Sequence, residues 1–290
     1  MPLPADLPIV DHHCHLSPSG EGIRAAQRFR AAGGTHLFLA TQNYETGVPG
    51  SLEDYRRQYE VTARLAERVR EETGTVVYVV VAPYPVDLVS LVPRLGPKEA
   101  VTVHFAALDL AATWVKEHRA VALGEVGRPH FAVSAEVQGA ADEVLRHALE
   151  AARDAGCPAV VHSEDLTLEG YRDLAVLAAR SGLPTARVIK HYARAFVAPD
   201  ERSGVTPSFL ARRELAAGSI NSPGPWFWET DFLDDPGRPG AVLDLTTVPR
   251  RAAQFLAREP SGAELLRGPF QDSVQAVYGF RPEIEDAPAS

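Results

Sequence analysis

The sequence is poor in several kinds of residue, and each shortage narrows what the chain can be. Only two cysteines, Cys14 and Cys157, and three lysines occur among the 290 residues. No spacing pattern links the two cysteines, so we expect two free thiols in a reducing cytoplasm. No apolar run approaches the roughly 18 residues that cross a membrane. The first residues also lack the basic and apolar regions of a secretory signal.

The charge balance is acidic, with 38 Asp and Glu against 29 Lys and Arg and a formal net charge of −9. Phosphate contacts need Lys and Arg, so this balance disfavours nonspecific binding to a polyphosphate. It remains compatible with a nucleic-acid substrate in a locally cationic, metal-lined pocket. Hydrophobic residues make up 45% of the chain, which is enough for the core of a sizeable globular protein.

Short β-rich runs alternate with helical patterns along the whole chain. We expect strands at 7–13, 35–41, 75–82, 120–126, 158–162, 187–191, 218–221 and 225–231. Helices are expected at 22–34, 51–74, 136–156, 167–181, 207–217, 248–257 and 262–278, and the stretch 86–118 is less regular. Ser51 and Asp54 have capping-box spacing at the start of the long helix. The alternation predicts an α/β protein, a single (β/α)8 TIM-type barrel domain over residues 1–290.

A doubly wound open sheet is the alternative fold. It would normally carry a glycine-rich phosphate loop after its first strand. The segment DHHCHL, residues 11–16, stands in that place instead. The barrel is therefore the favoured fold.

Potential metal ligands follow the apolar strands of this barrel, at the carboxyl ends where barrel active sites lie. They are His13, His15, Glu125, His162, His191 and Asp231. Each has an ordinary alternative explanation, such as a core histidine or a helix-capping aspartate. Six of them in register at strand ends favour a metal site, and a carboxylate such as Glu125 is costly there unless it is paired or coordinated.

The spacing within the first strand adds detail. Side chains two positions apart on a strand point to the same side, so His13 and His15 are expected to face one cation. His12 and Cys14 would then face the helices. Asp11 lies one layer deeper and is expected to orient a ligand imidazole.

The ordered motifs resemble those of the TatD-type metal-dependent hydrolases of the amidohydrolase superfamily. They are D-x-H-x-H at the first strand, G-E-V-G, VVHSE, VIKHY and ETDF. The resemblance runs from about residue 9 to about residue 280. The segments 32–36, 191–193 and 238–251 are most similar to a branch of TatD-related hydrolases common in archaea.

This resemblance implies a centre of two divalent ions. His13, His15 and Asp231 would hold one ion, His162 and His191 the other, and Glu125 would bridge them. Asp231 would also be the general base, so Asp231 and Glu125 are the expected catalytic residues. Several imidazole ligands favour Zn, with Mn or Mg as alternatives. Two such ions activate water for attack on a phosphodiester, ester or amide bond.

Some positions depart from the TatD nuclease pattern. Arg128, Pro129 and His130 occupy the positions where the TatD nucleases have a sequence similar to G-L-D. Ser163 and Glu164 occupy the positions of the usual Thr-Arg pair. The segment APYP at 82–85 lacks the histidine of the usual G-x-H-P element. Glu164 would repel phosphate, although Arg128 is a candidate to compensate for it.

These observations leave several functions open. An unassigned TatD-type hydrolase ranks first, then a DNA-directed deoxyribonuclease, then a lactonase or amidohydrolase. The substrate would be a small molecule or a nucleic-acid fragment, with no membrane partner. A metal-binding barrel without efficient catalysis and a non-hydrolytic lyase or isomerase are the remaining alternatives. Lys190 is expected to pack near the site rather than to bridge metals, and His130 is a weaker candidate for substrate contact.

Overall fold

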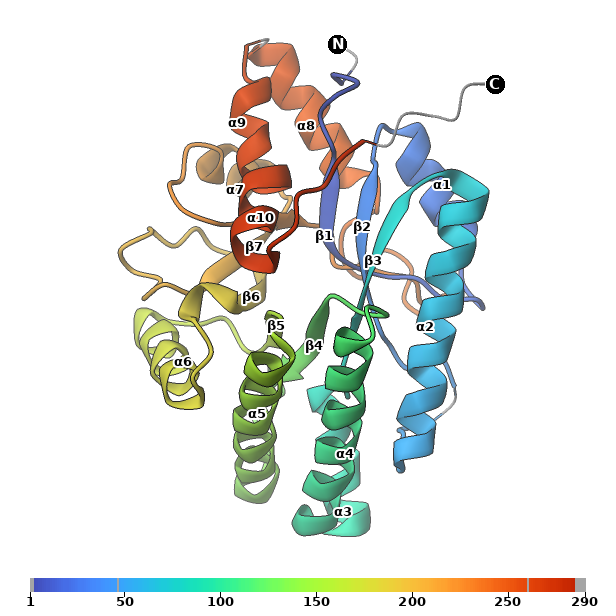
Figure 1. The fold of residues 1–290 in the computed structure, drawn as a ribbon, viewed down its shortest axis with the longest axis vertical. Helices are drawn as coiled ribbons and strands as arrows, with labels where there is room; N and C mark the ends of the chain where they lie inside the picture. Colours follow the sequence, from blue (N-terminus) through green and yellow to red (C-terminus); the bar gives the residue numbers. More distant parts are fainter. Residues whose placement is uncertain (1–2, 46, 260, 285–290) are drawn as a thin grey trace.

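The computed structural model describes residues 3–45, 47–259 and 261–284, and in this part of the chain one parallel sheet forms the centre of the molecule (Figure 1). Its strands run in the order β8-β7-β6-β5-β4-β3-β2-β1-β9. Their bounds are β1 Val10–His15, β2 His36–Ala40, β3 Val76–Val81, β4 Ala122–Gly127, β5 Ala159–His162, β6 Val188–Ala193, β7 Thr206–Leu210, β8 Phe227–Glu229 and β9 Phe232–Leu233.

Helices follow most of the strands and lie outside the sheet, as α2, α4, α5 and α6 do in Figure 1. The α-helices are α1 Ile23–Ala31, α2 Leu52–Thr73, α3 Leu88–Leu95, α4 Pro97–Lys116, α5 Ala135–Ala155, α6 Leu168–Ser181, α7 Arg213–Ser219, α8 Thr247–Arg258, α9 Ala263–Arg267 and α10 Ser273–Tyr278. Short 3-10 turns form η1 Pro85–Asp87 and η2 Thr185–Arg187, and a π-helical turn forms η3 Gly268–Asp272.

The sheet curls until its two ends meet, which gives a β/α barrel of the TIM type. The first strand, β1, pairs with β9 and also contacts β8. Polar contacts join this seam: the Asp231 backbone N–H donates to the His13 carbonyl at 2.9 Å, and Thr230 donates to the Asp11 carboxylate. The barrel prediction is confirmed, and the open doubly wound sheet is wrong.

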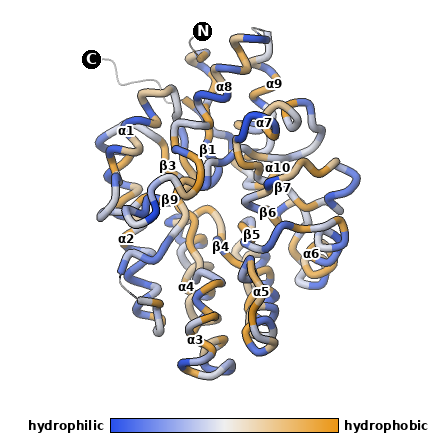
Figure 2. Tube along the Cα trace, turned by 180° about the vertical axis from the view of Figure 1, so that it is seen from behind, coloured by the Kyte–Doolittle hydropathy of each residue, from blue (hydrophilic) through white to orange (hydrophobic). Residues whose placement is uncertain are grey.

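Alternate residues of each strand enter two different hydrophobic clusters. On β2, Leu37 and Leu39 pack in the cluster shared with the outer helices, while Phe38 and Ala40 pack in the inner one. The strands accordingly carry hydrophobic residues on both faces. Along the covering helices, hydrophobic and hydrophilic positions are mixed (Figure 2).

The expectation that both His12 and Cys14 face the helices holds for Cys14, which lies in the outer cluster, and only in part for His12, whose Nε2 lies 2.8 Å from the Tyr278 hydroxyl of α10. The ring of His12 stacks on Phe227 with centroids 3.7 Å apart and also contacts Phe38, both in the inner cluster. The pairing of β1 with β2 shifts register between Asp11 and Cys14. Because of this register shift, the side chains of β1 do not alternate strictly between the two faces of the sheet, and His12 lies inside the barrel.

The long helix α2 begins and ends as its sequence predicts. The Ser51 hydroxyl accepts a hydrogen bond from the Asp54 backbone N–H, which satisfies one of the free amides of the first turn. Gly74 ends the helix in the left-handed conformation with φ 64°.

Two segments differ from their prediction. The stretch 86–118 is not irregular but contains α3 and α4, which are separated by Gly96, and Pro97 begins α4. Because α4 contacts α2, α3 and α5, its apolar residues do not form the single stripe that marks a surface helix.

The second difference concerns the seventh strand. We expected a helix at 207–217 and a strand at 218–221, but β7 occupies Thr206–Leu210 and α7 follows at Arg213–Ser219. Pro207 lies within β7, where proline is unusual because it cannot donate to the sheet. This proline hides the strand signal.

Among the described residues, no helix combines the length and the apolar character that a membrane crossing requires. Both cysteines are buried free thiols, as predicted.

Gly127 offers a test of how tightly the strands approach beneath the site. It has φ 134°, and an added Cβ would lie 2.0 Å from the carbonyl oxygen of His162. We predict that Gly127→Ala lowers the free energy of unfolding by roughly 2–3 kcal/mol, measured by chemical denaturation. The matched control is Gly139→Ala, since Gly139 lies exposed within α5 with no atom near the added Cβ. This control should raise stability by about 0.5–1 kcal/mol. Equal effects of the two substitutions would contradict the prediction.

Candidate metal centre

The candidate site lies at the carboxyl ends of β1, β4, β5 and β6 and in the turn that follows β8. A cavity of about 710 Å³ opens there. Five of the six predicted ligand residues line it: His15, Glu125, His162, His191 and Asp231. The sixth, His13, is 1% exposed and lies against them. The fold therefore brings together all six residues that the sequence singled out, although their role as ligands stays a prediction.

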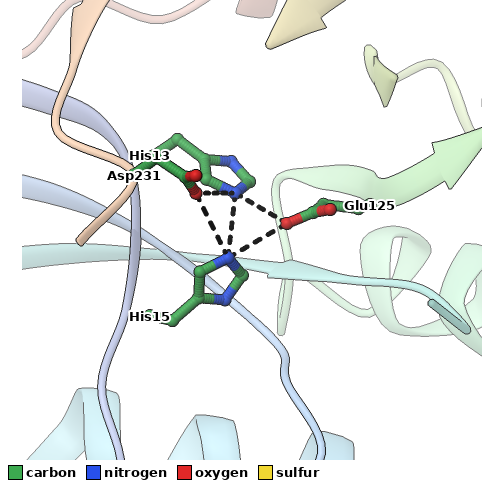
Figure 3. Close-up of side chains that lie close together, drawn as sticks. All are labelled: His13, His15, Glu125 and Asp231. Atoms are coloured by element: carbon green, nitrogen blue, oxygen red, sulfur yellow. Dashed lines mark hydrogen bonds and ion pairs between the residues drawn. The ribbon is translucent and has the colours of Figure 1, made fainter. Parts of the chain in front are cut away.

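One group consists of His13, His15, Glu125 and Asp231 (Figure 3). The Nε2 atoms of His13 and His15 are each 3.0 Å from Glu125 Oε1 and 3.2 Å from one another. Asp231 Oδ1 lies 3.7 Å from His13 Nε2 and 3.6 Å from His15 Nε2. Four potential ligand atoms thus converge on one point.

The second group shares Glu125 and adds His162 and His191. Glu125 Oε2 lies 2.7 Å from His162 Nδ1 and 3.5 Å from His191 Nε2, and these two nitrogens are 3.1 Å apart. The two oxygens of the carboxylate therefore face different groups of ligands. This arrangement fits the bridging position that the resemblance implies for Glu125.

The spacing of these atoms is that of ligands around a cation. Two ligands about 2.1 Å from a tetrahedral zinc ion lie about 3.4 Å apart, and the distances in the two groups run from 2.7 to 3.7 Å. Glu125 Oε2 is also buried, and its contacts with the imidazoles of His162 and His191 lack hydrogen-bond geometry. Since a buried carboxylate oxygen needs a compensating partner, a divalent ion fits both groups.

The pKa values of the same side chains report how strongly the carboxylates attract positive charge. Burial would raise the pKa of Glu125, but the imidazoles of His191 and His162 and hydrogen bonds from His13 and His15 hold it well below its usual range. Burial would lower the pKa of the histidines. Hydrogen bonds to Asp231 and Glu125 nevertheless raise that of His15 to about 10, and the charge of Glu125 raises that of His191 to about 9. Without metal, protons on His15 and His191 would therefore supply part of the positive charge that the carboxylates attract.

One residue of the site was missed by the sequence analysis. Glu229 ends β8, is fully buried, and accepts a hydrogen bond from the Tyr192 backbone N–H at 2.6 Å. Its Oε1 also lies 3.6 Å from Nδ1 of His191. Carboxylates in this position commonly orient a ligand histidine through its second nitrogen. The available signal was a second acidic residue at the end of the apolar run 225–229.

Asp11 has a different role from the expected one. It accepts hydrogen bonds from the backbone N–H groups of His13 and Thr230 and from the Thr230 hydroxyl, rather than from an imidazole. Burial raises the pKa of Asp11 to about 8, although the hydrogen bonds from Thr230 oppose this shift. Asp11 thereby fixes the backbone next to His13 and Asp231 instead of orienting a ligand ring.

Two further residues adjoin the site. His130 lines the cavity, and its Nδ1 lies 2.9 Å from His162 Nε2, the nitrogen that faces away from Glu125. The Lys190 ammonium donates to the carbonyl oxygens of Ser163 and His191, and burial lowers its pKa to about 8. These contacts agree with a packing role for Lys190.

Comparison with known proteins gives the family. The family model described as "TatD related DNase" matches residues 10–279. The chain belongs to this family. A curated relative, an uncharacterized protein of the archaeon Methanocaldococcus jannaschii, is 29% identical over 282 residues, which cover 96% of this chain and 98% of the relative. The family membership and the barrel together support a metal-dependent hydrolase.

Solved structures share the fold across nearly the whole chain. A TatD homologue from Escherichia coli is 17% identical with a TM-score of 0.58, covering 94% of this chain and 98% of its own. A TatD-like protein from Archaeoglobus fulgidus is 15% identical with a TM-score of 0.55, covering 89% and 99%. A mutant of a phosphotriesterase-like lactonase from Deinococcus radiodurans is 16% identical with a TM-score of 0.56, covering 96% and 98%. At these identities the likeness establishes the barrel alone.

Metal loading should be coupled to proton release. At pH 7.5 the metal-free protein carries protons on His15 and His191, whose pKa values are about 10 and 9. A ligand imidazole must be neutral, so saturation with Zn should release about two protons at pH 7.5. Affinity should rise with pH and level off above these pKa values. Calorimetric titration in buffers of different ionisation enthalpy measures the release, and binding with no proton release would contradict it.

Proposed function

We propose that this chain is a hydrolase that uses two divalent ions to activate water against an ester, amide or phosphodiester bond. The observation that carries the proposal is the buried Glu125 carboxylate, whose two oxygens each face a different set of imidazoles. His13, His15 and Asp231 would hold one ion, and His162 and His191 the other. The predominance of imidazole among the donors favours Zn over Mg, with Mn as an alternative.

When bound, such a pair of ions lowers the pKa of a water and neutralises charge on the oxygens of the bond being cut. The protein must then accept a proton at the attacking water. Asp231 suits this task because its side chain is 14% exposed toward the cavity, whereas that of Glu125 is 5% exposed. The Asp231 carboxylate oxygen that does not hold the ion would take the proton, and the hydrogen bond from its backbone N–H to the His13 carbonyl holds the residue at the seam.

The remaining chemistry is binding and orientation. Glu229 Oε1 lies 3.6 Å from His191 Nδ1, from where it would orient the ring, and Asp11 holds the backbone of the His13 strand. The substrate is a small molecule or a nucleic-acid fragment that enters the 710 Å³ cavity. We expect the protein to work in the cytoplasm without a membrane partner.

The general test is metal analysis combined with a substrate panel. The protein purified under gentle conditions should carry about two equivalents of metal. Chelation should abolish turnover on a panel of bis-p-nitrophenyl phosphate, carboxylic esters, lactones and dihydropyrimidines, and re-addition of Zn or Mn should restore it. Two bound metals with no turnover on any of these substrates would favour the non-catalytic barrel instead.

Glu125→Gln tests the bridging position. The substitution removes the negative charge that two ions would share, so metal content and turnover should fall together. Inductively coupled plasma analysis and a turnover assay on the same sample check this. Normal metal content with normal activity would refute the bridging role.

Asp231→Asn tests the general base. An amide oxygen can still coordinate, so the variant should keep much of its metal, but it cannot accept a proton at neutral pH. The turnover number should fall by about 10²–10⁴-fold. A variant with full rate and full metal content would remove Asp231 as the base.

A further inference from the structure

The charges around the cavity indicate which class of substrate it accepts. This inference rests on the hydrolase function proposed above. Six acidic residues line the cavity: Glu125, Glu164, Asp165, Asp231, Asp234 and Asp235. Two arginines, Arg194 and Arg238, are the only Lys or Arg side chains in that lining. The six carboxylates outnumber the two arginines and the two imidazoles, His15 and His191, that carry protons without metal, so the lining is net negative before any ion binds.

Neither arginine is a free cation. Arg194 pairs with Asp165, with Nε 3.0 Å from Oδ2, and Arg238 pairs with Asp235, with Nε 2.7 Å from Oδ2. These pairs are exposed and individually weak. A phosphate that recruited either arginine would still release a carboxylate at the same place, so the mouth of the cavity would remain negative.

Glu164 adds a negative charge that has no close ion-pair partner, although the buried Lys190 ammonium attracts it. It is exposed on the loop after β5 and makes no ion pair within the described part of the chain. The sequence analysis offered Arg128 as a counter-charge, but the Arg128 guanidinium pairs with Asp142 on α5 and is not part of the cavity lining. That compensation is therefore absent from the structure.

Apart from these charged groups and the imidazoles, the lining is uncharged. Leu233, Pro236, Ala241 and Val242 supply an apolar wall, and Tyr84 and Tyr192 add aromatic surface. Such a surface suits an uncharged organic group, which loses little on leaving water. A chain of phosphates would instead have to leave water without meeting a free cation.

From this charge distribution we infer that the substrate is a small organic ester or amide, cyclic forms included. Apart from the group that is cleaved, this substrate carries no negative charge. Glu164 is the residue that excludes polyanions. Two bound cations would still attract one anionic group at the centre. The second and later phosphates of a nucleic acid would meet carboxylates, neutral groups and two arginines that are already paired with aspartates.

Binding distinguishes this substrate class from a nucleic acid. The metal-loaded full chain is titrated with dimethyl phosphate, which has one phosphodiester, and with a thymidine tetranucleotide. We expect the two affinities to agree within about threefold and to depend little on salt. A tetranucleotide that binds tenfold more tightly with a steep salt dependence, or that is cleaved, would overturn the inference.

Charge reversal tests Glu164 directly. Glu164→Arg should tighten tetranucleotide binding by on the order of tenfold and leave dimethyl phosphate within twofold, because only the longer ligand reaches this residue. Glu164→Gln should show a smaller effect in the same direction. Glu143→Arg is the matched control, since Glu143 is exposed on α5 outside the cavity and the substitution changes the net charge equally. An equal effect of Glu143→Arg, or none from Glu164→Arg, would contradict the role of Glu164.

Turnover gives a second readout for the same variants. Among p-nitrophenyl esters, kcat/KM should be at least about tenfold higher for the butyrate than for the anionic succinate, and Glu164→Arg should narrow this gap. A preference for succinate would overturn the inference. The hydrolase proposal is judged separately: a chain that binds no metal contradicts that proposal, whereas affinity that climbs with each added phosphate contradicts only the substrate class.

Discussion

A buried carboxylate surrounded by imidazoles is the constraint on which the rest of this structure depends. Glu125 is 4% exposed, and its oxygens face His13 and His15 on one side and His162 and His191 on the other. An anion in such a place must be compensated, because burial penalises its charged form heavily. Glu125 lies near the end of β4, and the imidazoles that compensate its charge lie near the ends of β1, β5 and β6. The barrel thus holds the carboxylate and the imidazoles within a few ångströms of one another.

Further contacts hold the residues around Glu125 in place, both at the seam of the barrel and beside the histidines of β5 and β6. Asp11 holds the backbones of β1 and of the turn after β8 together, so that Asp231 meets the histidines of β1 across the seam of the barrel. Glu229 stands behind His191, and His130 contacts the outer nitrogen of His162. Buried Asp11 and Glu229 thus support the centre from behind, whereas His130 contacts it from within the cavity.

Most of the fold and all six central residues could be predicted from the sequence. Each of these residues follows an apolar run that is easy to recognise as a buried strand. The predictions fail where local pattern and tertiary environment disagree. Pro207 obscures β7, and α4 packs on several sides and so lacks a single apolar stripe. The register shift in β1 turns His12 into the barrel. Glu229 was overlooked beside Asp231, because only the three-dimensional contact with His191 separates the tasks of these two neighbouring acids.

The central claim is that Glu125 lies between two ions, and a crystal structure of the protein with its metal tests it most directly. Anomalous difference maps collected at the zinc edge should show two peaks about 3.5–4 Å apart, one near each oxygen of Glu125. One peak should lie among His13, His15 and Asp231, and the other beside His162 and His191. A fully loaded crystal with a single peak, or with peaks beyond coordination distance of Glu125, would contradict the account.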